Sequence, residues 1–560
     1  MDFRDILSDN TFMADVLTVA QRSYNMSRIR SKNTGPEIQL RNLLRAAGIT
    51  NFSNNTKGIA GTPDFYFPER KLAVFVNGCF WHGCRVCYKA PSTNQVFWKT
   101  KIGANILRDR TVTAELRNQN IQVIRISQHE LKKKPQIFMK QIKNTLGVSE
   151  FPRVLDLFAG AGGFSEGFVA AGCNMIAHIE MDNDACQTIR TRMIYHSLRR
   201  MGRLDEYEAY LRGTIEMKDL IEKYNLQDEY NSVIRAKIGR DNYQDLIKEV
   251  RGRLKGESLD LIIGGPPCQA YSNIGRGSDR KHMQNDERNY LYRYYIEFLK
   301  ALKPKMFIFE NVPGLESAGG GVYLRTMRML MKRAGYVTDY RILNASDFGV
   351  PQERRRIILI GWKKNLDIKN YPDFQVIERK YLVRDFLKGL PSLKPGEGKL
   401  WQKYNSSPAL LVTLGIINPE IGVLTDHVAR PHAKRDLEIY KLALLKKAKG
   451  ENIRYNKLPS RLKTHKNQEG FLDRFKVVDG SARACHTVIA HIAKDGHYYI
   501  HPDILQNRSL TVREAARIQT FPDDFKFEGS RTSQFKQIGN AVPPMLSAVI
   551  AEKILNLIYG

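Results

Sequence analysis

Short apolar runs that end abruptly are the main feature of the hydrophobic pattern, and they predict an α/β protein. The clearest run is residues 259–263, closed by Gly264-Gly265-Pro266-Pro267, as expected for a buried parallel strand that ends in a loop. Similar strand-like runs lie at residues 72–76, 122–126, 153–158, 174–179, 306–309 and 357–360. Residues 544–558 predict a final helix that returns to pack on the first half of its domain.

The length of 560 residues predicts at least two domains, because a single core stops growing at roughly 250–300 residues. We expect an extension at residues 1–24, a first domain at 25–148, and a doubly wound second domain made of 149–362 and 507–560. Residues 363–506 would form a smaller domain. The charged, helix-forming residues 190–256 are interpreted as a helical insertion in the second domain.

Lysine and arginine outnumber aspartate and glutamate by 88 to 58, and the formal net charge of +30 favours a polyanionic partner such as nucleic acid. Among the seven cysteines only Cys79, Cys84 and Cys87 cluster, which favours a reducing, cytosolic compartment over a disulfide framework. The first residues lack the basic start of a signal peptide, and we find no apolar run that would span a bilayer. The sequence therefore predicts neither secretion nor membrane insertion.

Three closely spaced cysteines in such a compartment favour a tetrahedral zinc site with Cys79, Cys84 and Cys87 as thiolate ligands. His129 is the best candidate for the fourth ligand, since it follows the strand-like residues 122–126. The alternative is three free cysteines in the interior. Asp64 starts a strand that would pair with residues 72–76, a frame able to hold a further metal ion.

The motifs around these residues resemble the very short patch repair endonucleases, which nick DNA beside T:G mismatches left by deamination of 5-methylcytosine. The resemblance covers about residues 25–140 and joins several motifs in family order. They are residues 26–32, Gly61-Thr62-Pro63-Asp64, residues 78–83, residues 97–102 and Arg108-Asp109-Arg110. The resemblance implies a restriction-endonuclease-like α/β domain with a zinc site.

The same resemblance implies that Asp64 binds a catalytic Mg²⁺, that His82 is the acid and base partner, and that Glu37 assists. Phe80 and Trp81 would wedge into the base stack beside the mismatch, an unstacking that is least costly at a mispaired step. Ordinary core packing is the alternative for both aromatic residues.

The second domain begins with a strand, a glycine-rich turn and a helix, where backbone N–H groups can approach a nucleotide-like cofactor. Glu180 ends the next strand, about 20 residues on, and is placed to bond ribose hydroxyls. Cys268 follows the Gly-Gly-Pro-Pro loop, where a cysteine in a basic site can lie partly as thiolate. Glu310 ends the strand-like residues 306–309, and three arginines precede residues 357–360. We expect thiol, acid and guanidinium to meet at the carboxyl ends of parallel strands.

These motifs, with residues 508–517 and 537–544, resemble the DNA cytosine-5 methyltransferases from about Val154 to the C-terminus. The resemblance implies that a cytosine is flipped out of the duplex, that the Cys268 thiolate adds to C6, and that Glu310 donates to the ring N3. Arg354 and Arg356 would steady the base and the backbone nearby. Residues 363–506, where the family pattern disappears, would be the target-recognition domain.

The resemblance also assigns cofactor and DNA contacts. S-adenosylmethionine would be held by Asp156, Phe158, Ala159, Gly160, Gly162, Gly163, Phe164, Glu180, Met181, Pro266, Asn540 and Ala541. Double-stranded DNA would be contacted by Phe80, Trp81, Gln269, Ser272, Gln352 and Thr487. A third cofactor motif is expected between residues 189 and 255, where Gly213-Thr214-Ile215 is the candidate. We expect the methyltransferase part to act as a monomer in the prokaryotic cytosol.

Three interpretations of the first domain stay open in the sequence. It could be a nickase that starts repair of the deaminated methylation product, or a restriction nuclease that cuts unmethylated sites. It could also be a catalytically silent DNA-binding module. Asn77 keeps the last interpretation open, because many family members have a second histidine there and an amide cannot transfer a proton at neutral pH.

Overall fold

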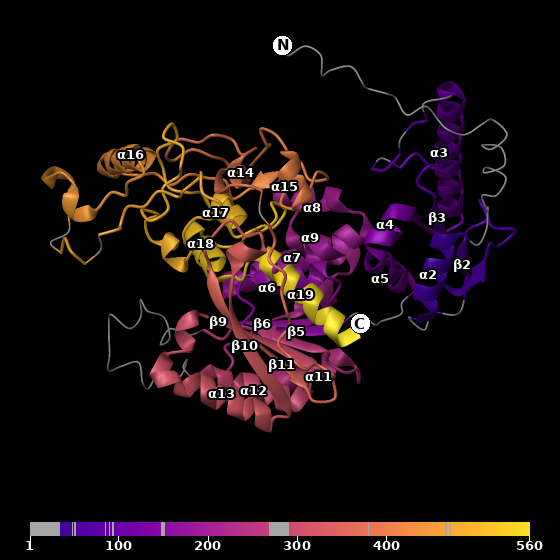
Figure 1. Cartoon of the computed structure of the whole chain (residues 1–560), viewed down its shortest axis with the longest axis horizontal. Helices are drawn as coiled ribbons and strands as arrows, with labels where there is room; N and C mark the ends of the chain where they lie inside the picture. Colours follow the sequence, from indigo (N-terminus) through magenta and orange to yellow (C-terminus); the bar gives the residue numbers. More distant parts are fainter. Residues whose placement is uncertain are drawn as a thin grey trace, which may run out of the picture. The chain divides into compact units, whose positions relative to one another are not determined.

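The computed structural model describes residues 34–46, 49, 52–84, 86–88, 90–91, 94–146, 152–267, 290–378, 380–464, 467–470 and 472–559. The chain divides into two compact units, Met1–Phe151 and Pro152–Gly560, which are described separately below (Figure 1). The division falls close to the expected domain boundary between residues 148 and 149.

The first unit contains a four-stranded sheet in the order β1-β2-β3-β4. Its strands are β1 (Ser53–Asn54), β2 (Phe65–Phe67), β3 (Leu72–Asn77) and β4 (Gln122–Ser127). Its helices are α2 (Gly35–Ala46), the short 3-10 turn η1 (Pro68–Arg70), the long α3 (Gln95–Asn118), α4 (Gln128–Lys133) and α5 (Pro135–Leu146). The strands expected at residues 72–76 and 122–126 are thereby confirmed.

The two central strands of this sheet determine where its functional side chains lie. β3 and β4 run parallel, and their last residues, Asn77 and Ser127, are register partners. The core between sheet and helices contains Leu40, Val74 and Ile124 among other buried apolar residues. The loops after β3 and β4 therefore leave the sheet at the same edge, which brings the segments at 78–84 and 128–129 together.

The second unit contains a seven-stranded sheet in the order β10-β11-β9-β8-β5-β6-β7. The strands are β5 (Arg153–Leu157), β6 (Asn174–Glu180), β7 (Val233–Arg235), β8 (Leu261–Gly264), β9 (Met306–Asn311), β10 (Tyr336–Asn344) and β11 (Arg355–Lys363). The chain extends the sheet from β5 toward β7 and then returns to add β8 and β9 on the other side of β5. This reversal creates a topological switch point between β5 and β8, where open α/β sheets bind ligands.

The sheet is mixed: the expected doubly wound sheet also contains an antiparallel part. β11 pairs antiparallel with both β9 and β10, whereas the pairs that join β9, β8, β5, β6 and β7 are parallel. Only residues 345–354, including the 3-10 turn η8 (Ala345–Phe348), connect β10 to β11. This connection is too short for a crossover helix, so β11 must run antiparallel to β10.

The interpretation of residues 190–256 as a helical insertion is wrong in part. β7 lies inside this range and pairs in parallel with β6, and α11 (Tyr243–Leu254) packs Leu246 and Val250 into the core of the sheet. β7 has only three residues, too few to show the alternation of a strand, and the charged outer face of α11 made the whole range look like exposed helix. The segments outside the sheet layers are α8 (Leu204–Leu211), α9 (Met217–Tyr224) and α10 (Gln227–Asn231).

Helices cover both faces of the second sheet, which gives three layers (Figure 1). One face is covered by α11, α12 (Leu291–Leu302) and α13 (Val322–Arg333). On the other side lie α6 (Gly163–Ala170), α7 (Asn183–Met201) and α19 (Pro544–Tyr559). α19 packs against α6, which confirms the expected return of the last helix.

Residues Arg531–Tyr559 are long and apolar enough, by length and composition, to cross a membrane, contrary to the expectation from the sequence. This stretch consists of α18 (Arg531–Asn540) followed by α19, with a break at Ala541, where the backbone is extended. Leu546, Ile550 and Ile554 of α19 are fully buried in the core of the second unit. The apolar character of α19 is therefore explained by its packing on the sheet.

Residues 363–506 contain few regular elements. They are α14 (Val383–Leu387), β12 (Trp401–Gln402), α15 (Ala409–Thr413), β13 (Leu424–Thr425), α16 (Lys434–Ala448) and the 3-10 turns η9 (Tyr455–Lys457), η10 (Ser460–Leu462) and η11 (Ala490–Ala493). α16 has its own core with Tyr455 and Phe475. Val478 and Val488 instead pack with α17 (Val512–Ile518) and α18, so this region and the C-terminal segment share a core.

Candidate active sites

A cavity of about 1480 Å³ opens at the carboxyl ends of β5, β6, β7, β8 and β9 in the second unit. Of the residues expected to hold the cofactor, ten line it: Asp156, Phe158, Ala159, Gly160, Phe164, Glu180, Met181, Pro266, Asn540 and Ala541. Its size and its position at the switch point suit a nucleotide-like cofactor together with a second ligand.

The glycine-rich turn after β5 forms one wall of this cavity. Phe158 adopts a left-handed backbone conformation with φ of 59°. This conformation is strained for a bulky residue, and such strained residues are found mostly at functional sites. Gly163 does not line the cavity; a Cβ there would come within 2.4 Å of the carbonyl oxygen of Val542. Gly162 also lies outside the lining residues, and its φ of +81° requires glycine. These two glycines shape the turn and allow close packing of α6.

Glu180, at the end of β6, holds this turn in place. One carboxylate oxygen accepts the N–H of Gly160 at 2.8 Å, and the other accepts the N–H groups of Met181 and Asp182, each at 2.8 Å. Burial raises the pKa of Glu180 despite these donors. Oε2, which accepts only the Gly160 N–H, has a second lone pair, so Glu180 can still accept a hydroxyl from a ligand in the cavity.

Asp156 provides a test of whether the cavity suits a cationic cofactor. Its Oδ2 accepts the hydroxyl of Ser165, whereas its buried Oδ1 has no hydrogen-bond partner among the described residues. Burial, opposed by Ser165 and reinforced by the charge of Glu180, raises the pKa of Asp156 to about 8. An unpaired carboxyl oxygen in the cavity wall fits a ligand that supplies a donor or a positive charge, as S-adenosylmethionine does.

Glu310 and Arg356 form an ion pair at the same edge of the sheet. The Nε of Arg356 lies 2.8 Å from Oε1 of Glu310, and the two side chains are 12% and 13% exposed. Because β11 is antiparallel to β9, the start of β11 lies beside the end of β9, and this places Arg356 next to Glu310. The arginine thus arrives from the amino end of an antiparallel strand, not from the carboxyl end of a parallel one.

The loop that precedes Cys268 approaches this pair closely. A Cβ on Gly265 would lie 2.5 Å from Oε2 of Glu310, so any side chain there would displace the Glu310 carboxylate. Asn311 donates to the carbonyl oxygen of Pro266 at 3.3 Å and fixes the loop from the other side. Cys268, Gln269 and Ser272 lie outside the described residues, and their roles stay predictions.

Two other predicted residues, Arg354 and Gln352, are engaged in the interior, and their expected contacts with base or DNA require correction. Arg354 is fully buried and donates to the carbonyl oxygens of Val488 and Gly539. Gln352 is also fully buried and bonds to backbone and side-chain groups of the protein. Thr487 is half-buried and its hydroxyl donates to the carbonyl oxygen of Glu353; its expected contact with DNA stays a prediction. Arg354 precedes β11, which begins at Arg355, so the side-chain alternation of that strand does not apply to it, and residue type alone did not separate Arg354 from Arg356.

Two segments that were not predicted from the sequence also line the cavity. Residues 236–242 follow β7, and residues 290–294 begin α12. The expected third cofactor motif at Gly213-Thr214-Ile215 does not line the cavity, and the segment after β7 takes that place. The only local sign of this strand is the short apolar run Val233-Ile234 before Lys237 and Gly239. A run this short cannot be distinguished from part of a helix. Lys536 of α18 adds a further positive charge to the lining.

In the first unit, Asp64, Glu37 and His82 are brought together from three different segments. The Oδ2 of Asp64 accepts the N–H of Val76 in β3 at 2.6 Å. Burial raises the pKa of Asp64 to about 6; the Val76 N–H opposes this shift, and the negative charge of Glu37 adds to it. Glu37 itself is 4% exposed and accepts the hydroxyl of Thr34 at 2.8 Å. Two adjacent carboxylates of this kind can bind a divalent cation.

His82 belongs to a hydrogen-bonded series that the sequence analysis did not identify. Its Nδ1 lies 2.5 Å from Oδ2 of Asp109, a residue of α3. Arg125 of β4 is 3.2 Å from the other carboxylate oxygen of Asp109 and 3.5 Å from Oδ1 of Asn77. Burial tends to raise the pKa of Asp109, but the bond to His82 and the charges of His82 and Arg125 hold it below its usual value. Asp109 therefore orients the imidazole of His82.

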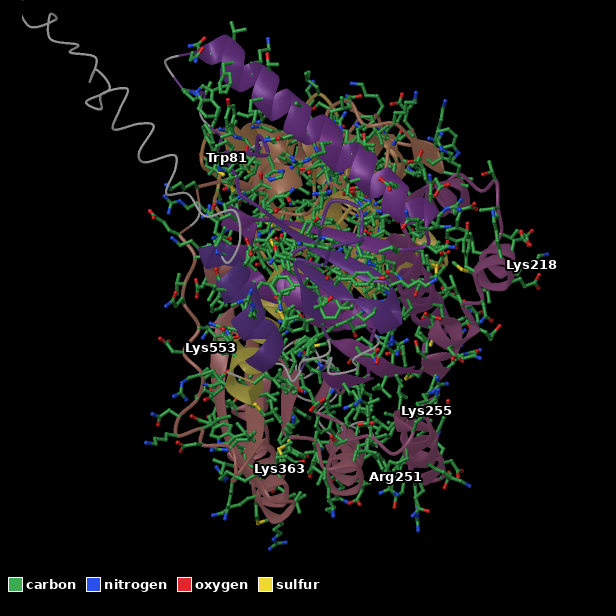
Figure 2. All side chains as sticks on the ribbon, turned by 90° about the vertical axis from the view of Figure 1, so that its right-hand side faces the viewer. Trp81, Lys218, Arg251, Lys255, Lys363 and Lys553 are labelled. Carbon is green, nitrogen blue, oxygen red and sulfur yellow. The ribbon has the colours of Figure 1, made fainter. Side chains whose placement is uncertain are left out.

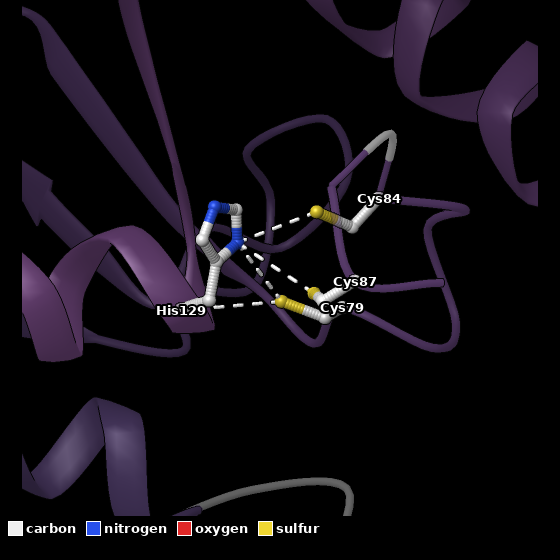
Figure 3. A group of neighbouring side chains, drawn as sticks. All are labelled: Cys79, Cys84, Cys87 and His129. Carbon is white, nitrogen blue, oxygen red and sulfur yellow. Dashed lines mark hydrogen bonds between the residues drawn. The ribbon is translucent and has the colours of Figure 1, made fainter. Parts of the chain in front are cut away.

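Cys79, Cys84, Cys87 and His129 converge on one point (Figure 3). The Nδ1 of His129 lies 3.4, 3.3 and 3.7 Å from the three sulfur atoms, in that order. Tetrahedral zinc with ordinary bond lengths places nitrogen and sulfur ligands about 3.6 Å apart. Cys79 and His129 each follow the end of β3 or β4, so the parallel strands create the site.

Phe80 and Trp81 lie on the loop held by these ligands. Their ring centroids are 5.3 Å apart, and those of both residues are within 6 Å of the ring of Trp98 in α3. Both side chains are partly exposed, and Trp81 is labelled in Figure 2. The packing among these rings fits the alternative of a structural role, and the exposed portions leave surface for a base. The expected wedge stays a prediction.

Comparison with known proteins agrees with this description. The second unit has a mixed α/β sheet with the cavity at its topological switch point. It is similar to the crystal structure of a protein described as a DNA modification methyltransferase encoded within an E. coli prophage. That match has a TM-score of 0.50 and 24% identity, and covers 73% of this chain and 99% of that chain.

The sequence profile of the C-5 cytosine-specific DNA methylases matches residues 152–206 and 213–556. The chain belongs to this family. A type II methyltransferase of Bacillus paralicheniformis is 41% identical over 73% of this chain and 99% of its own length. A type II methyltransferase of Desulfomicrobium norvegicum is 31% identical over 72% of this chain and 88% of its own length. The profile of the DNA mismatch endonuclease Vsr matches residues 14–89. Both resemblances seen in the sequence are confirmed.

Proposed function

We propose that the second unit transfers a methyl group from S-adenosylmethionine to C5 of a cytosine flipped out of a specific duplex site. The observation that supports this most directly is the Glu310–Arg356 pair beside the Gly265-Pro266 loop, in a cavity lined by the glycine-rich turn. Duplex DNA is the expected substrate of this family, and flipping is needed because the faces of C5 and C6 cannot be reached in the stack.

The residues of the chain would act in a definite order. The Cys268 thiolate adds to C6 of the cytosine, while Glu310 donates to the ring N3 and stabilises the charge that moves into the ring. Arg356 holds the Glu310 carboxyl in position from 2.8 Å. S-adenosylmethionine supplies the methyl group to C5. Loss of the C5 proton then expels the Cys268 thiolate and restores the aromatic ring.

Cofactor binding would fall to the residues around the turn after β5. Asp156 and Glu180 would face the positively charged and hydroxyl groups of the cofactor, and Phe158 and Asn540 would border them. Dissolved duplex DNA would be attracted by the basic surface of the chain. Basic side chains such as Lys218, Arg251 and Lys255 extend outward from α9 and from the end of α11 (Figure 2).

The Cys268→Ser variant tests the methylation mechanism. It should lose methyl transfer to unmethylated plasmid DNA while binding S-adenosylhomocysteine as the unchanged protein does, because the thiol does not form the cofactor wall. Transfer near the rate of the unchanged protein would refute Cys268 as the nucleophile.

We also propose that the first unit is a restriction-endonuclease-like, Vsr-type domain that nicks DNA beside T:G mismatches. Asp64 and Glu37 would bind Mg²⁺, which activates water and stabilises charge on the phosphate. His82, oriented by Asp109, would move the proton, and Arg125 would occupy the space beside Asn77 as a fixed positive charge. Methylation by the second unit would create the base whose deamination product the first unit recognises.

A nicking assay on three duplexes separates this proposal from its alternatives. We expect cleavage of a duplex that carries a T:G mismatch within the methylated site, and no cleavage of the paired duplex, methylated or not. Cleavage of only the unmethylated paired duplex would instead identify a restriction nuclease. Failure to cut any of the three would identify a silent DNA-binding module.

Zinc at the Cys79, Cys84, Cys87 and His129 group is proposed as structural, because all four positions would be filled by protein ligands. The Cys84→Ser variant should bind less than one equivalent of zinc and unfold its first unit at lower temperature. Methyl transfer should be unchanged. Equal zinc content in both proteins would contradict the assignment. The bacterial relatives favour an intracellular location, and action as a monomer stays a prediction.

A further inference from the structure

Three buried polar side chains of the second unit take no part in the proposed chemistry. They are Gln352, Arg354 and Gln519, and all three are fully buried. No carboxylate of the described residues forms an ion pair with Arg354, and its Nε has no hydrogen-bond partner among them. Burial and the nearby charge of Arg356 lower the pKa of Arg354 well below its usual value. A buried guanidinium without an ionic partner is costly, so its presence needs a reason other than stability.

Gln352 and Arg354 hold one peptide segment from two sides. The Oε1 of Gln352 accepts the N–H of Val488 at 3.0 Å, and Nη1 of Arg354 donates to the carbonyl oxygen of Val488 at 2.9 Å. The neighbouring Thr487 donates its hydroxyl to the backbone of Glu353. Residues 487–490, called the return segment here, lie within the predicted target-recognition region and lead into η11. Their backbone is therefore fixed to the start of β11.

The same side chains also hold the end of α18. Nη2 of Arg354 donates to the carbonyl oxygen of Gly539 at 3.1 Å. Nε2 of Gln352 donates to Oε1 of Gln519 at 2.7 Å, and Nε2 of Gln519 donates to the carbonyl oxygen of Ile538 at 2.6 Å. The next residues, Asn540 and Ala541, line the cofactor cavity. The hydrogen-bond series thus runs from the return segment to the cavity wall.

Direct packing joins the same two segments. A Cβ on Gly539 would lie 2.2 Å from the backbone nitrogen of Ala490 and 2.3 Å from the carbonyl carbon of Ile489. Backbone therefore lies against backbone at this point, with no side chain between. A movement of the return segment cannot be absorbed here and must displace Gly539 and the residues that follow it.

We propose that Arg354, with Gln352 and Gln519, is a positioning element that couples the return segment to the cofactor-cavity wall at Asn540 and Ala541. DNA that engages the return segment would then strengthen binding of the cofactor, and the cofactor would strengthen binding of DNA by the same factor. This inference rests on the proposed reading of residues 363–506 as the target-recognition region.

The test uses the full chain with S-adenosylhomocysteine and unmethylated plasmid DNA as probes. The Kd of S-adenosylhomocysteine is measured by equilibrium dialysis with and without the plasmid, for the unchanged protein and for Arg354→Lys. We expect DNA to tighten binding about 5-fold or more in the unchanged protein and to have less than half that effect in Arg354→Lys. The variant keeps the charge but cannot reach both carbonyl groups with a planar fork.

Two further variants keep the result interpretable. Gly539→Ala leaves every polar group in place and should also reduce the effect of DNA, because its methyl group separates the two segments. Arg333→Met removes an exposed arginine from α13 and should behave as the unchanged protein does. Circular dichroism and thermal melting of each variant establish that it is folded.

The outcomes separate the proposals. Folded Arg354→Lys and Gly539→Ala proteins that keep the full effect of DNA would overturn the coupling, as would an unchanged protein in which DNA has no effect. If Thr487→Ala leaves the KM for DNA unchanged while Arg354→Lys still loses the effect, the coupling stands and the recognition role of the return segment fails. If Thr487→Ala raises the KM for DNA and Arg354→Lys loses the effect of DNA on cofactor binding, both the recognition role and the coupling are supported.

Discussion

The carboxyl groups at the two candidate sites have neighbours of opposite charge: a positive one in the second unit and a negative one in the first. In the second unit, Glu310 has Arg356 at 2.8 Å and so lies beside a permanent positive charge. In the first unit, Asp64 lies beside another carboxylate, Glu37, and burial raises its pKa to about 6. Arg125 is near Asp64 but forms its ion pair with Asp109. One site carries its own counter-charge, whereas the other leaves negative charge for a cation from solution.

This difference predicts what each reaction requires. Methyl transfer to a neutral cytosine ring needs a donor that is held in place, and an arginine can hold it. Hydrolysis of a phosphodiester develops negative charge on the phosphate oxygen atoms. A bound divalent cation stabilises that charge better than an arginine that is already paired with a carboxyl group. The pairing of each carboxylate therefore agrees with the reaction proposed for its unit. The predictions below test this contrast, beginning with the largest effect.

Removal of either member of the Glu310–Arg356 pair should have the largest effect. Glu310→Gln should slow methyl transfer on the order of 10²- to 10⁴-fold, because the amide cannot deliver an acidic proton to the ring N3. Arg356→Met should slow it by a smaller factor, since the carboxyl remains but loses its orientation. Single-turnover transfer of a labelled methyl group to plasmid DNA measures both. Equal and small losses would show that the pair is structural.

The contrast between Arg354 and Arg356 also shows what the sequence could reveal. Glycine-rich turns, strand ends and the zinc ligands are local patterns, and each was predicted from neighbouring residues. The direction of β11 depends on the short β10–β11 connection, and no local pattern in the sequence indicates that direction. With that direction unknown, the sequence could not show that Arg356 faces Glu310 while Arg354 is buried.

Contacts from distant segments were the other part that the sequence could not supply. Asp109 and Arg125 lie 27 and 43 residues after His82 in the chain, and no spacing rule links them; only the parallel pairing of β3 and β4 and the packing of α3 bring them together. β7 was missed for a different reason. Three residues are too few to show a strand period, although their position beside β6 completes the cavity.

Asp64→Asn tests the metal requirement of the first site. Nicking of a T:G duplex should fall at least about 10²-fold, because the amide binds Mg²⁺ weakly and several kcal/mol of charge stabilisation are lost. Methyl transfer by the same preparation should be unchanged, which serves as the internal control for folding and concentration. Loss of both activities would show that the two units are not independent. Undiminished nicking would remove Asp64 from the metal site.

The pH dependence of nicking should follow the raised pKa of Asp64. Its folded pKa of about 6 lies above the value of 3.8 for a free carboxyl, so the fold favours the protonated form. The stability that this contributes is present at low pH and is lost as pH rises toward 6. Metal binding needs the ionised form, so nicking should fall about tenfold per pH unit below 6. Higher Mg²⁺ concentrations should shift the midpoint to lower pH.

Initial rates between pH 5 and pH 8 at two Mg²⁺ concentrations measure this effect. Two Mg²⁺ concentrations are needed because a general loss of DNA binding at low pH would lower the rate equally at both concentrations. A midpoint that does not move with Mg²⁺ would assign the titration to a group other than the metal ligand.

The smallest effect should come from Asp156, the carboxyl with neither an arginine nor a second carboxylate in contact. Its pKa of about 8 means that it is mostly protonated at neutral pH, and a cationic cofactor must displace that proton to gain an ionic contact. The affinity for S-adenosylmethionine should therefore rise between pH 6.5 and pH 8.5, by up to about tenfold relative to Asp156→Asn. The ratio of the two Kd values at each pH cancels titration of the cofactor itself. A ratio that stays constant over this range would mean that Asp156 keeps its proton when the cofactor binds, and that its free Oδ1 serves as a neutral hydrogen-bonding group.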